Sequence, residues 1–433
     1  MKLCILIAAA LVAVAAANQV VSTKKVICYY DSKSYVRESN ARLLPPDLEP
    51  ALPYCTHLVY GYAGVQPDTY KMISTNQNLD IDSAHANYRT ITSFKTKYPQ
   101  LKVLLAVGGD ADLEDPQKYN ALLESQQART AFVNSGVVLA EQHGFDGIDL
   151  AWQFPKVKPK KIRSGWGNFW HGVKKTFKTT PVDEKESEHR EGFTALVREL
   201  KAALSLKPHL ELGVTILPNV NSTIYCDVPA IINFVDYVNL LAFDYFTPER
   251  NEKEADYTAP IYAPQNRHPE QNVDAAVKYW RNAGAPPTKI VVGIATYART
   301  WKLDSDSEIA GVPPIHTDGA GEPGPYTKTE GLLSYPEVCM KLIAPPAGLR
   351  ANIRKVTDPS KRFGTYAFRL PDSDGNGGIW VSYEDADTAG QKADYVKKNN
   401  LGGISIVDLS MDDFRELCTG NKYPILRAAK YRL

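Results

Sequence analysis

The sequence predicts an α/β fold, a (β/α)8 TIM barrel that carries a small α+β insertion domain. Short runs of β-branched residues alternate with longer helical patterns along most of the chain. Eight such runs occur, which is the number of strands that closes this barrel. The chain has 433 residues and a hydrophobic content of 44%, so it can bury one large core and still accommodate an insert.

The predicted strands are short and mostly apolar, and the segments between them have helical periodicity. In a barrel of this kind the functional residues lie at the C-terminal ends of the strands. The strands span Val26–Tyr30, His57–Tyr62, Lys102–Val107, Phe145–Trp152, Glu211–Ile216, Val235–Phe243, Lys289–Thr296 and Gly403–Val407. The helices that separate them include Ser125–His143, Glu186–Leu206 and Val273–Ala283.

The chain begins with the features of a secretory signal peptide. Lys2 precedes an apolar run from Leu3 to Ala17, which ends in three alanines before Asn18. The run is too short to span a bilayer comfortably, and no later stretch is long and apolar enough to do so. We therefore predict that residues 1–17 are removed and that the mature protein is soluble, secreted and extracellular, without membrane insertion.

Five cysteines remain after Cys4 leaves with the signal peptide: Cys28, Cys55, Cys226, Cys339 and Cys418. In an oxidising compartment an odd number of cysteines predicts two disulfides and one leftover thiol. The sequence contains neither a Cys-x-x-Cys motif nor a His/Cys cluster, so we predict no metal site.

Three further features concern modification and partners. Asn221-Ser222-Thr223 is an N-glycosylation sequon after a predicted strand, so we expect Asn221 to be glycosylated on a surface loop.

The formal net charge of +1 gives no reason to expect a nucleic acid partner. The Gly-x-Gly-x-x-Gly match at 319–324 lacks the flanking strand and helix of a dinucleotide site, so no cofactor is predicted.

Residues 155–181, directly after the fourth strand, form a basic aromatic loop without any acidic residue. Such a run can be a solvated loop, and that interpretation stays open. Its aromatic residues and its place on the functional face of a barrel also suggest a surface for an anionic partner. The residues proposed for that contact are Lys156, Lys158, Lys160, Lys161, Arg163, Trp166, Trp170, Lys174 and Lys175.

Residues 301–378 interrupt the alternation a second time, between the seventh and the last strand. They are rich in Gly and Pro and contain aromatic runs such as Arg362 to Arg369. We predict that they form the α+β insertion domain, and that the barrel consists of residues 18–300 and 379–433.

The fourth strand contains an unusual set of polar residues within the apolar segment Phe145 to Phe154. Asp149, Ala151 and Gln153 alternate along the strand and share one face, whereas Asp146 points to the other. A buried carboxylate is costly unless it is hydrogen-bonded or catalytic, so this strand is the best candidate for a functional site.

With these motifs in place, the chain resembles glycoside hydrolase family 18, the chitinases, over nearly the whole mature sequence. The resemblance implies disulfides Cys28–Cys55 and Cys339–Cys418 and leaves Cys226 unassigned. Its markers are Cys28-Tyr29-Tyr30, Ala106-Val107-Gly108-Gly109, the Asp146 strand, Val238 to Asp244, Gly293 to Arg299, Gly324-Pro325-Tyr326, Leu333-Ser334-Tyr335 and Leu401-Gly402-Gly403.

The resemblance also implies that the catalytic site is degenerate. The family's strand reads Asp-Gly-x-Asp-x-Asp-Trp-Glu, in which the Glu protonates the leaving oxygen and the last Asp orients the substrate N-acetyl group, which attacks the sugar carbon. The matching residues here are Asp146, Asp149, Ala151 and Gln153, so an amide replaces the acid and a methyl group replaces the orienting carboxylate. A tyrosine that holds the N-acetyl group is matched by Phe243, and the neighbouring Asp244 is retained.

The tryptophans on which sugar rings stack in the family are also replaced, by Lys33, Asp110 and Val407. We therefore expect that the protein is not an enzyme. An active chitinase with a rearranged acid is the least favoured alternative, because the remaining carboxylates match supporting positions.

Within the family the chain looks most like the imaginal disc growth factors of insects, which have Gln at the acid position and an insertion after the fourth strand. The resemblance implies a monomeric growth factor for imaginal disc cells that acts with insulin-like peptides, through a cell-surface receptor or an insulin-like peptide/receptor complex. It also implies roles in cuticle formation and wound healing. The alternative is a lectin for chitin or an acidic polysaccharide.

Overall fold

The computed structural model describes residues 24–433 except 83, 113–114, 159–182, 208, 308–309, 344–352, 373–376 and 419. The predicted signal peptide lies outside the described residues. So does most of the predicted basic aromatic loop, of which 155–158 are described. Within the described ranges, no helix is long and apolar enough to cross a membrane.

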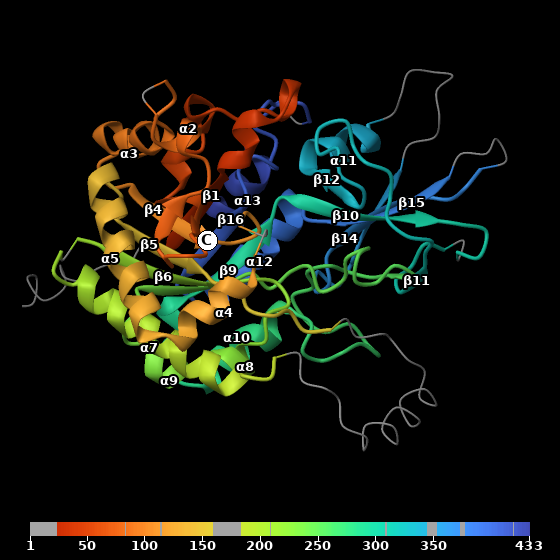
Figure 1. Ribbon diagram of the computed structural model, residues 1–433. Helices are drawn as coiled ribbons and strands as arrows, with labels where there is room; N and C mark the ends of the chain where they lie inside the picture. The colour runs from red at the N-terminus through yellow and green to blue at the C-terminus, as the bar shows by residue number, and fades with distance from the viewer. Residues whose placement is uncertain are drawn as a thin grey trace, which may run out of the picture.

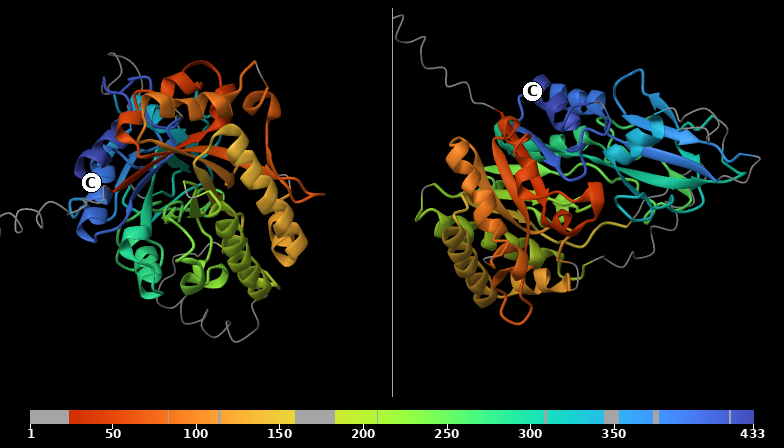
Figure 2. Two further views of the ribbon diagram at one scale, coloured as in Figure 1. Left: turned by 90° about the vertical axis from the view of Figure 1, so that its left-hand side faces the viewer. Right: turned by 90° about the horizontal axis from the view of Figure 1, so that it is seen from above.

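Eight parallel strands form a closed barrel, which confirms the predicted fold class (Figures 1 and 2). They follow one another in chain order around the barrel, and the last pairs with the first. A short strand, β3 (Met72–Ser74), adds antiparallel to the end of the second. The barrel strands are β1 (Lys25–Asp31), β2 (His57–Val65), β4 (Lys102–Gly108), β5 (Gly147–Ala151), β6 (Glu211–Ile216), β7 (Tyr237–Leu240), β9 (Ile290–Ala295) and β16 (Gly403–Val407).

Helices lie between the strands and cover the outside of the barrel (Figure 2). The three helices predicted above are α5 (Gln126–His143), α7 (Glu186–Leu204) and α10 (Val273–Asn282). The other helices are α2 (Gln77–Asp80), α3 (Asn87–Lys97), α4 (Gln117–Glu124), α8 (Ser222–Tyr225), α9 (Val228–Ile231), α11 (Tyr335–Leu342), α12 (Ala386–Lys398) and α13 (Pro424–Arg432).

Local chemistry sets the ends of α5. The Ser125 hydroxyl accepts a hydrogen bond from the Ala128 amide and so satisfies one of the free N–H groups of the first turn. Gly144 ends the helix with φ 74°, a left-handed conformation that glycine adopts without a Cβ penalty. The turn then leads directly into the strand that carries the candidate site.

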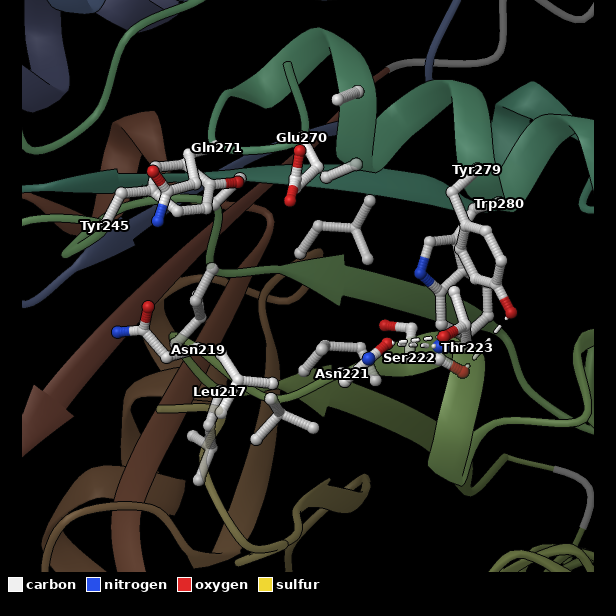
Figure 3. Close-up of a pocket in the computed structure, with 18 residues that line it drawn as sticks. Leu217, Asn219, Asn221, Ser222, Thr223, Tyr245, Glu270, Gln271, Tyr279 and Trp280 are labelled. Carbon is white, nitrogen blue, oxygen red and sulfur yellow. Dashed lines mark hydrogen bonds between the residues drawn. The ribbon is translucent and has the colours of Figure 1, made fainter. Parts of the chain in front are cut away.

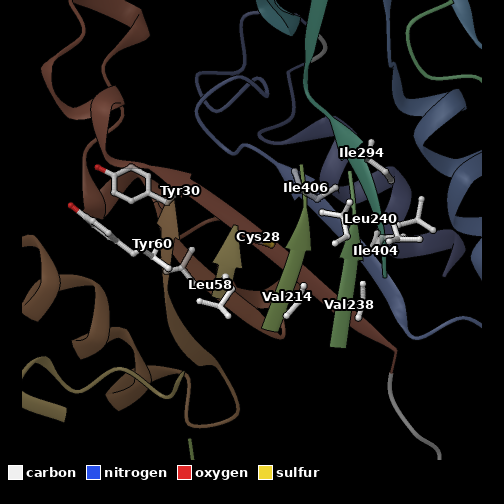
Figure 4. Packing of buried hydrophobic residues seen from close by; sticks show 14 of the residues in the cluster. Cys28, Tyr30, Leu58, Tyr60, Val214, Val238, Leu240, Ile294, Ile404 and Ile406 are labelled. Atoms are coloured by element: carbon white, nitrogen blue, oxygen red, sulfur yellow. The ribbon is translucent and has the colours of Figure 1, made fainter. Parts of the chain in front are cut away.

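Alternate residues of the barrel strands point inward and outward. Tyr29, Val59 and Leu104 belong to a cluster inside the barrel. Cys28 and Tyr30, with the opposite parity, join the large core between the strands and the helices. Figure 4 shows part of this outer core, with labelled side chains that include Leu58 of β2, Val238 of β7 and Ile404 of β16. The barrel is therefore filled by side chains, as in other closed eight-stranded barrels.

The insertion domain is built on a five-stranded antiparallel sheet in the order β12-β10-β15-β14-β13. The sheet and α11 lie to one side of the barrel (Figure 1). The predicted insertion domain, residues 301–378, begins within the first strand of this sheet in chain order and ends at the start of the last one. The strands are β10 (Tyr297–Leu303), β12 (Leu332–Ser334), β13 (Arg354–Thr357), β14 (Thr365–Arg369) and β15 (Gly378–Tyr383), and a separate two-stranded ladder pairs β8 (Glu254–Ala255) with β11 (Ile315–His316).

Three barrel strands are shorter than the sequence predicts: β9 by one residue at each end, and β5 and β7 by more. The predicted strand Val235–Phe243 is β7, Tyr237–Leu240, and the predicted strand Phe145–Trp152 is β5, Gly147–Ala151. An apolar run continues past the point where ladder pairing stops, because the residues beyond it remain buried. After Leu240 the chain leaves the barrel ladder and reaches Asp244, which has φ 57°.

The structure contains disulfides Cys28–Cys55 and Cys339–Cys418, the pairing that the resemblance implies. The remaining described cysteine, Cys226, is a buried free thiol. Burial raises the pKa of the Cys226 thiol to about 12. This thiol is therefore neutral and inert in the folded protein.

Candidate functional site at the mouth of the barrel

Asp149 is the fully buried carboxylate of the fourth barrel strand, and it lies inside the barrel. The Tyr29 hydroxyl donates to Asp149 Oδ2 at 2.6 Å, and Thr215 Oγ1 lies 2.9 Å from both carboxylate oxygens. Burial raises the pKa of Asp149 to about 6, although both hydroxyl groups act to lower it. The carboxylate is thus held in place by the barrel interior.

The polar contacts around Asp149 extend across the barrel to two further strands. Asn239 Nδ2 donates to the Tyr29 hydroxyl oxygen at 3.1 Å, and Ser405 Oγ donates to Asn239 Oδ1 at 2.7 Å. Side chains from β1, β5, β6, β7 and β16 therefore form one connected hydrogen-bond network. The network satisfies polar groups that would otherwise be costly to bury.

Asp146 lies on the opposite side of the strand, as its parity predicts. Lys95 Nζ donates to Asp146 Oδ1 at 2.7 Å, and the Val103 amide donates to Oδ2 at 2.8 Å. These contacts join the start of β5 to α3 and β4. They give Asp146 a structural role, because it does not reach the barrel mouth.

Ala151 and Phe243 belong to an apolar cluster at the C-terminal end of the barrel. Val407 packs against this cluster, whose other buried members are Leu217, Leu241, Ala259 and Ala295. Phe243 also contacts Tyr297 edge to face, with the ring centroids 6.0 Å apart. The two positions at which the resemblance predicts lost N-acetyl contacts, Ala151 and Phe243, therefore lie in one apolar cluster.

Gln153, which the resemblance predicts to replace the family's catalytic acid, is only 7% exposed. Its Nε2 donates to the Gly109 carbonyl oxygen at 2.7 Å. Its Oε1 is buried and has no hydrogen-bond partner among the residues that the structure describes. An amide has no acidic proton to transfer, so this side chain can donate or accept hydrogen bonds but cannot protonate a leaving group.

The Asp244 carboxylate accepts hydrogen bonds from two side chains of β10, and one of them, Arg299, balances its charge. Arg299 donates from Nε to Oδ1 at 2.9 Å and from Nη2 to Oδ2 at 2.7 Å, and the Tyr297 hydroxyl donates to Oδ2 at 2.8 Å. The two-pronged contact matches the planar guanidinium to the carboxylate. Burial acts to lower the pKa of the Arg299 guanidinium, but the adjacent Asp244 carboxylate outweighs it and leaves the pKa raised, so the guanidinium stays charged.

Two of the replaced tryptophan positions contact each other at the mouth. Lys33 Nζ lies 3.4 Å from the Asp110 carbonyl oxygen, and Lys156 Nζ lies 3.5 Å from Asp110 Oδ1. A pocket of about 910 Å³ opens here, lined by Asp110, Lys156 and Gln153 among others. Lys33 and Asp110, which the resemblance predicts to replace two sugar-stacking tryptophans, thus contact each other, and Lys156 pairs with Asp110.

The structure places only the beginning of the predicted basic aromatic loop. Lys156 pairs with Val220 in an isolated antiparallel bridge, and the Val157 carbonyl oxygen accepts a hydrogen bond from Arg250 Nη2 at 2.8 Å. Lys158 is exposed. The remaining predicted contact residues lie outside the described part of the chain: Lys160, Lys161, Arg163, Trp166, Trp170, Lys174 and Lys175.

Sequence reasoning missed two carboxylates at the mouth, Asp31 and Asp408. Asp31 ends β1 and Asp408 follows β16, and Arg37 Nη2 lies 3.6 Å from Asp31 Oδ2. Burial, and then the nearby Asp408, raise the pKa of Asp31 to about 6. Burial also raises the pKa of Asp408. Both residues end barrel strands, which is the only feature of the sequence that could have indicated them.

Asn221 lines a second pocket of about 510 Å³, which α8 and α10 help to form and which shares Leu217 with the pocket at the mouth (Figure 3). Its Oδ1 accepts hydrogen bonds from the Thr223 amide at 2.9 Å and from the Thr223 hydroxyl at 2.7 Å. Tyr279 and Trp280 line the same pocket. Among the described residues, no group of three or more His, Cys, Asp or Glu side chains could hold a metal ion.

Comparison with known protein families shows to which family the chain belongs. The family described as glycosyl hydrolases family 18 matches residues 25–412, which include every residue of the mouth described above. This chain belongs to that family. Within family 18, it is 74% identical over 427 residues to chitinase-like protein EN03 of Bombyx mori, covering 98% of both chains. It is 55% identical over 417 residues to chitinase-like protein Idgf4 of Drosophila melanogaster, covering 94% of both.

Solved structures of family 18 proteins share the fold. The catalytic domain 2 of the Ostrinia furnacalis Group II chitinase has a TM-score of 0.78 and 29% identity, with 95% of this chain and 96% of that chain covered. Human YKL-39, described as a pseudo-chitinase with retained chitooligosaccharide binding properties, has a TM-score of 0.75 and 26% identity, with coverages of 95% and 99%. Family 18 therefore includes both chitinases and chitinase-like proteins.

Proposed function

We propose that this protein is a secreted, catalytically inactive chitinase-like growth factor. It promotes proliferation, polarisation and motility of imaginal disc cells in cooperation with insulin-like peptides. Its similarity to a protein named Idgf4 and to one named imaginal disk growth factor 6 supports this assignment. The signal-peptide pattern of residues 1–17 supports secretion.

The observation that carries the inactivity is the environment of Gln153. The amide is tied to the Gly109 carbonyl oxygen at the place where the family's mechanism needs a proton donor. General acid catalysis contributes roughly 10²–10⁴-fold to a rate, and this contribution is lost with an amide. Ala151 and Phe243 remove two groups that would orient an N-acetyl nucleophile, which adds a further loss of positioning.

The direct test is a growth assay with the protein purified from culture medium. We expect dose-dependent proliferation of imaginal disc-derived cells, stronger when insulin is also present. Heat-unfolded protein at the same doses is the control. Absence of stimulation at every dose, with and without insulin, would remove the growth-factor proposal. N-terminal sequencing of the same preparation should begin at Asn18 if the signal peptide is cleaved as proposed.

A second candidate function is glycan binding without hydrolysis. The buried Oε1 of Gln153 lacks a partner among the described residues and lines the 910 Å³ pocket, so it could accept a hydrogen bond from a sugar hydroxyl. The retained binding named for YKL-39 supports this candidate. Lys33, Asp110 and Val407 count against the chitin version, because none offers an aromatic surface for a sugar ring.

Calorimetric titration separates the two candidates. The protein is titrated with chitin oligosaccharides and with heparin-type oligosaccharides, at low and moderate salt. Heat with chitin at both salt concentrations would favour the lectin. Heat with the acidic sugar that falls with salt would favour the basic aromatic loop 155–181 as the contact. No heat with either sugar would leave the protein-receptor proposal as the better one.

A further inference from the structure

The antiparallel register of the insertion domain brings two cations onto one face of its sheet. Lys302 of β10 pairs with Ile379 of β15, and Ile379 pairs in turn with Arg369 of β14. Directly paired residues of adjacent strands project from the same face. The neighbouring row, Trp301, Trp380 and Phe368, projects from the other face and forms the domain's own core.

A third cation comes from the helix that packs on the same face. α11 lies beside β10 and β12 (Figure 1), and its last turn carries Lys341. Lys302, Lys341 and Arg369 all line one pocket of about 190 Å³, whose wall includes Gly321 to Pro323. Three positive side chains from three elements thus converge on one small cavity.

The positive charges in this pocket are poorly matched by the protein itself. Arg369 Nη2 donates to the Gly377 carbonyl oxygen at 2.7 Å, which fixes the guanidinium, but its buried Nε has no acceptor among the residues described. None of the three cations forms an ion pair with a described carboxylate. Asp318, whose amide donates to the Lys302 carbonyl oxygen at 2.8 Å, is already paired with Lys253 at 2.5 Å.

The pocket size limits what can bind. Sites for drug-sized molecules have volumes of roughly 300–1,000 Å³, so a cavity of about 190 Å³ holds a single small group. Glu322 also lines the pocket, which leaves three positive charges against one negative charge. The surplus of two matches a dianion, and a fixed guanidinium with a free N–H suits an oxygen of a sulfate or phosphate.

We propose that this pocket of the insertion domain binds a tetrahedral oxyanion, sulfate or phosphate, either free or carried as an ester on a sugar. Arg369 supplies the oriented N–H donor, and Lys302 and Lys341 supply mobile positive charge at the entrance, where both are exposed. The site is separate from the pocket at the barrel mouth, with which it shares no lining residue. It does not depend on the growth-factor proposal.

The test is calorimetric titration of the full-length secreted protein at constant ionic strength set with sodium chloride. The probes are sodium sulfate, sodium phosphate, glucosamine 6-sulfate and glucosamine 6-phosphate. We expect saturable binding of the free oxyanions. Arg369→Gln should weaken binding about tenfold or more, because it removes a charge-assisted hydrogen bond. The double variant Lys302→Gln/Lys341→Gln should weaken it to a similar extent, and its exposed positions leave folding intact.

Arg354→Gln is the matched control. Arg354 is an exposed arginine of the adjacent strand that pairs with Phe368 and lies over its ring, on the other face of the sheet. Its loss should leave oxyanion affinity unchanged. Equal weakening in the Arg354 and Arg369 variants would show a diffuse charge effect and overturn the proposal, as would heats no larger than those with chloride. The ester that binds more tightly identifies the source, a sulfated or a phosphorylated sugar.

Discussion

Arg299 holds Asp244 through two hydrogen bonds, from Nε to Oδ1 and from Nη2 to Oδ2. The first strand of the insertion domain, β10, is thereby joined to the segment that follows the sixth barrel strand, β7. The ion pair has a structural consequence that can be measured separately from any binding.

Replacement of Arg299 by Gln should destabilise the fold by about 3 kcal/mol, because it leaves a mostly buried carboxylate without its partner. The free energy of unfolding in urea measures the effect. Tyr297→Phe removes a single hydrogen bond to the same carboxylate and should cost only about 1 kcal/mol. Equal losses of unfolding free energy in the two variants would mean that the ion pair stabilises the fold no more than a single hydrogen bond does.

Restoring the family's two carboxylates should not restore a good chitinase. The double variant Gln153→Glu/Ala151→Asp regains the acid and the orienting group, but Phe243 still lacks a hydroxyl and Lys33, Asp110 and Val407 still replace the sugar platforms. Hydrolysis of a fluorogenic chitin trisaccharide should stay near the background of the unchanged protein. Substantial turnover would show that the acid alone had been limiting.

The Asp149 carboxyl should make the free energy of unfolding larger at mildly acidic pH than at neutral pH. Its pKa is about 6 in the fold, against an ordinary value near 3.9, so the folded state binds more protons between these values. Its contribution to the free energy of unfolding therefore decreases as pH rises from about 4 to about 6, by at most roughly 3 kcal/mol. The stability difference between the wild type and Asp149→Asn, measured in urea, should change over this window and level off above it. Parallel pH curves would contradict the assignment.

Glu211 at the opposite end of the barrel should show the reverse dependence. His57 and Lys102 donate to its carboxylate and lower its pKa to about 2, against an ordinary value near 4.3, even though burial opposes the shift. Its stabilisation is present above about pH 4.3 and is lost as pH falls toward 2.

Because the Glu211 side chain is only partly buried and its Lys102 partner is exposed, solvent screens the interaction, and we expect Glu211→Gln to cost only about 1–2 kcal/mol at pH 7. Urea unfolding at pH 3, 5 and 7 should show the gap between Glu211→Gln and the wild type closing at the lowest pH. If the difference in unfolding free energy between Glu211→Gln and the wild type were the same at all three pH values, the destabilisation would come from packing and not from the charge.

Cys226 should be unreactive until the protein unfolds. The thiol is fully buried, and burial raises its pKa to about 12, so almost no thiolate is present at neutral pH. A chromogenic disulfide reagent should detect about one thiol per mature chain in denaturant and almost none in the native protein. Fast labelling of the native protein would mean that this region opens readily.

The barrel could be predicted from the sequence because each strand is a local apolar run with its own periodicity. The same periodicity placed Asp149 inside and Asp146 outside, which the hydrogen bonds confirm. The importance of Gln153 came from the family resemblance, since an isolated glutamine in a strand carries no such meaning. Local reasoning was less successful at strand ends, where burial continues after pairing has stopped.

Contacts between distant segments could not be predicted in this way. Arg299 reaches Asp244 only because β10 turns out of the barrel directly after β9. Lys33 and Asp110 were identified as two lost aromatic platforms, and nothing in the sequence indicated that they contact each other. Such pairs depend on the register and direction of elements that are far apart in the chain, which single-sequence periodicity does not contain.

The disulfide between Cys339 and Cys418 joins α11 of the insertion domain to the segment before α13 and closes a long stretch of chain. A protease that cuts once anywhere between these two cysteines would therefore produce fragments that remain covalently attached. Such a nicked molecule would run as one band on a non-reducing gel and as two bands after reduction. In an extracellular fluid rich in proteases, the insertion domain would stay with its barrel after the first cut.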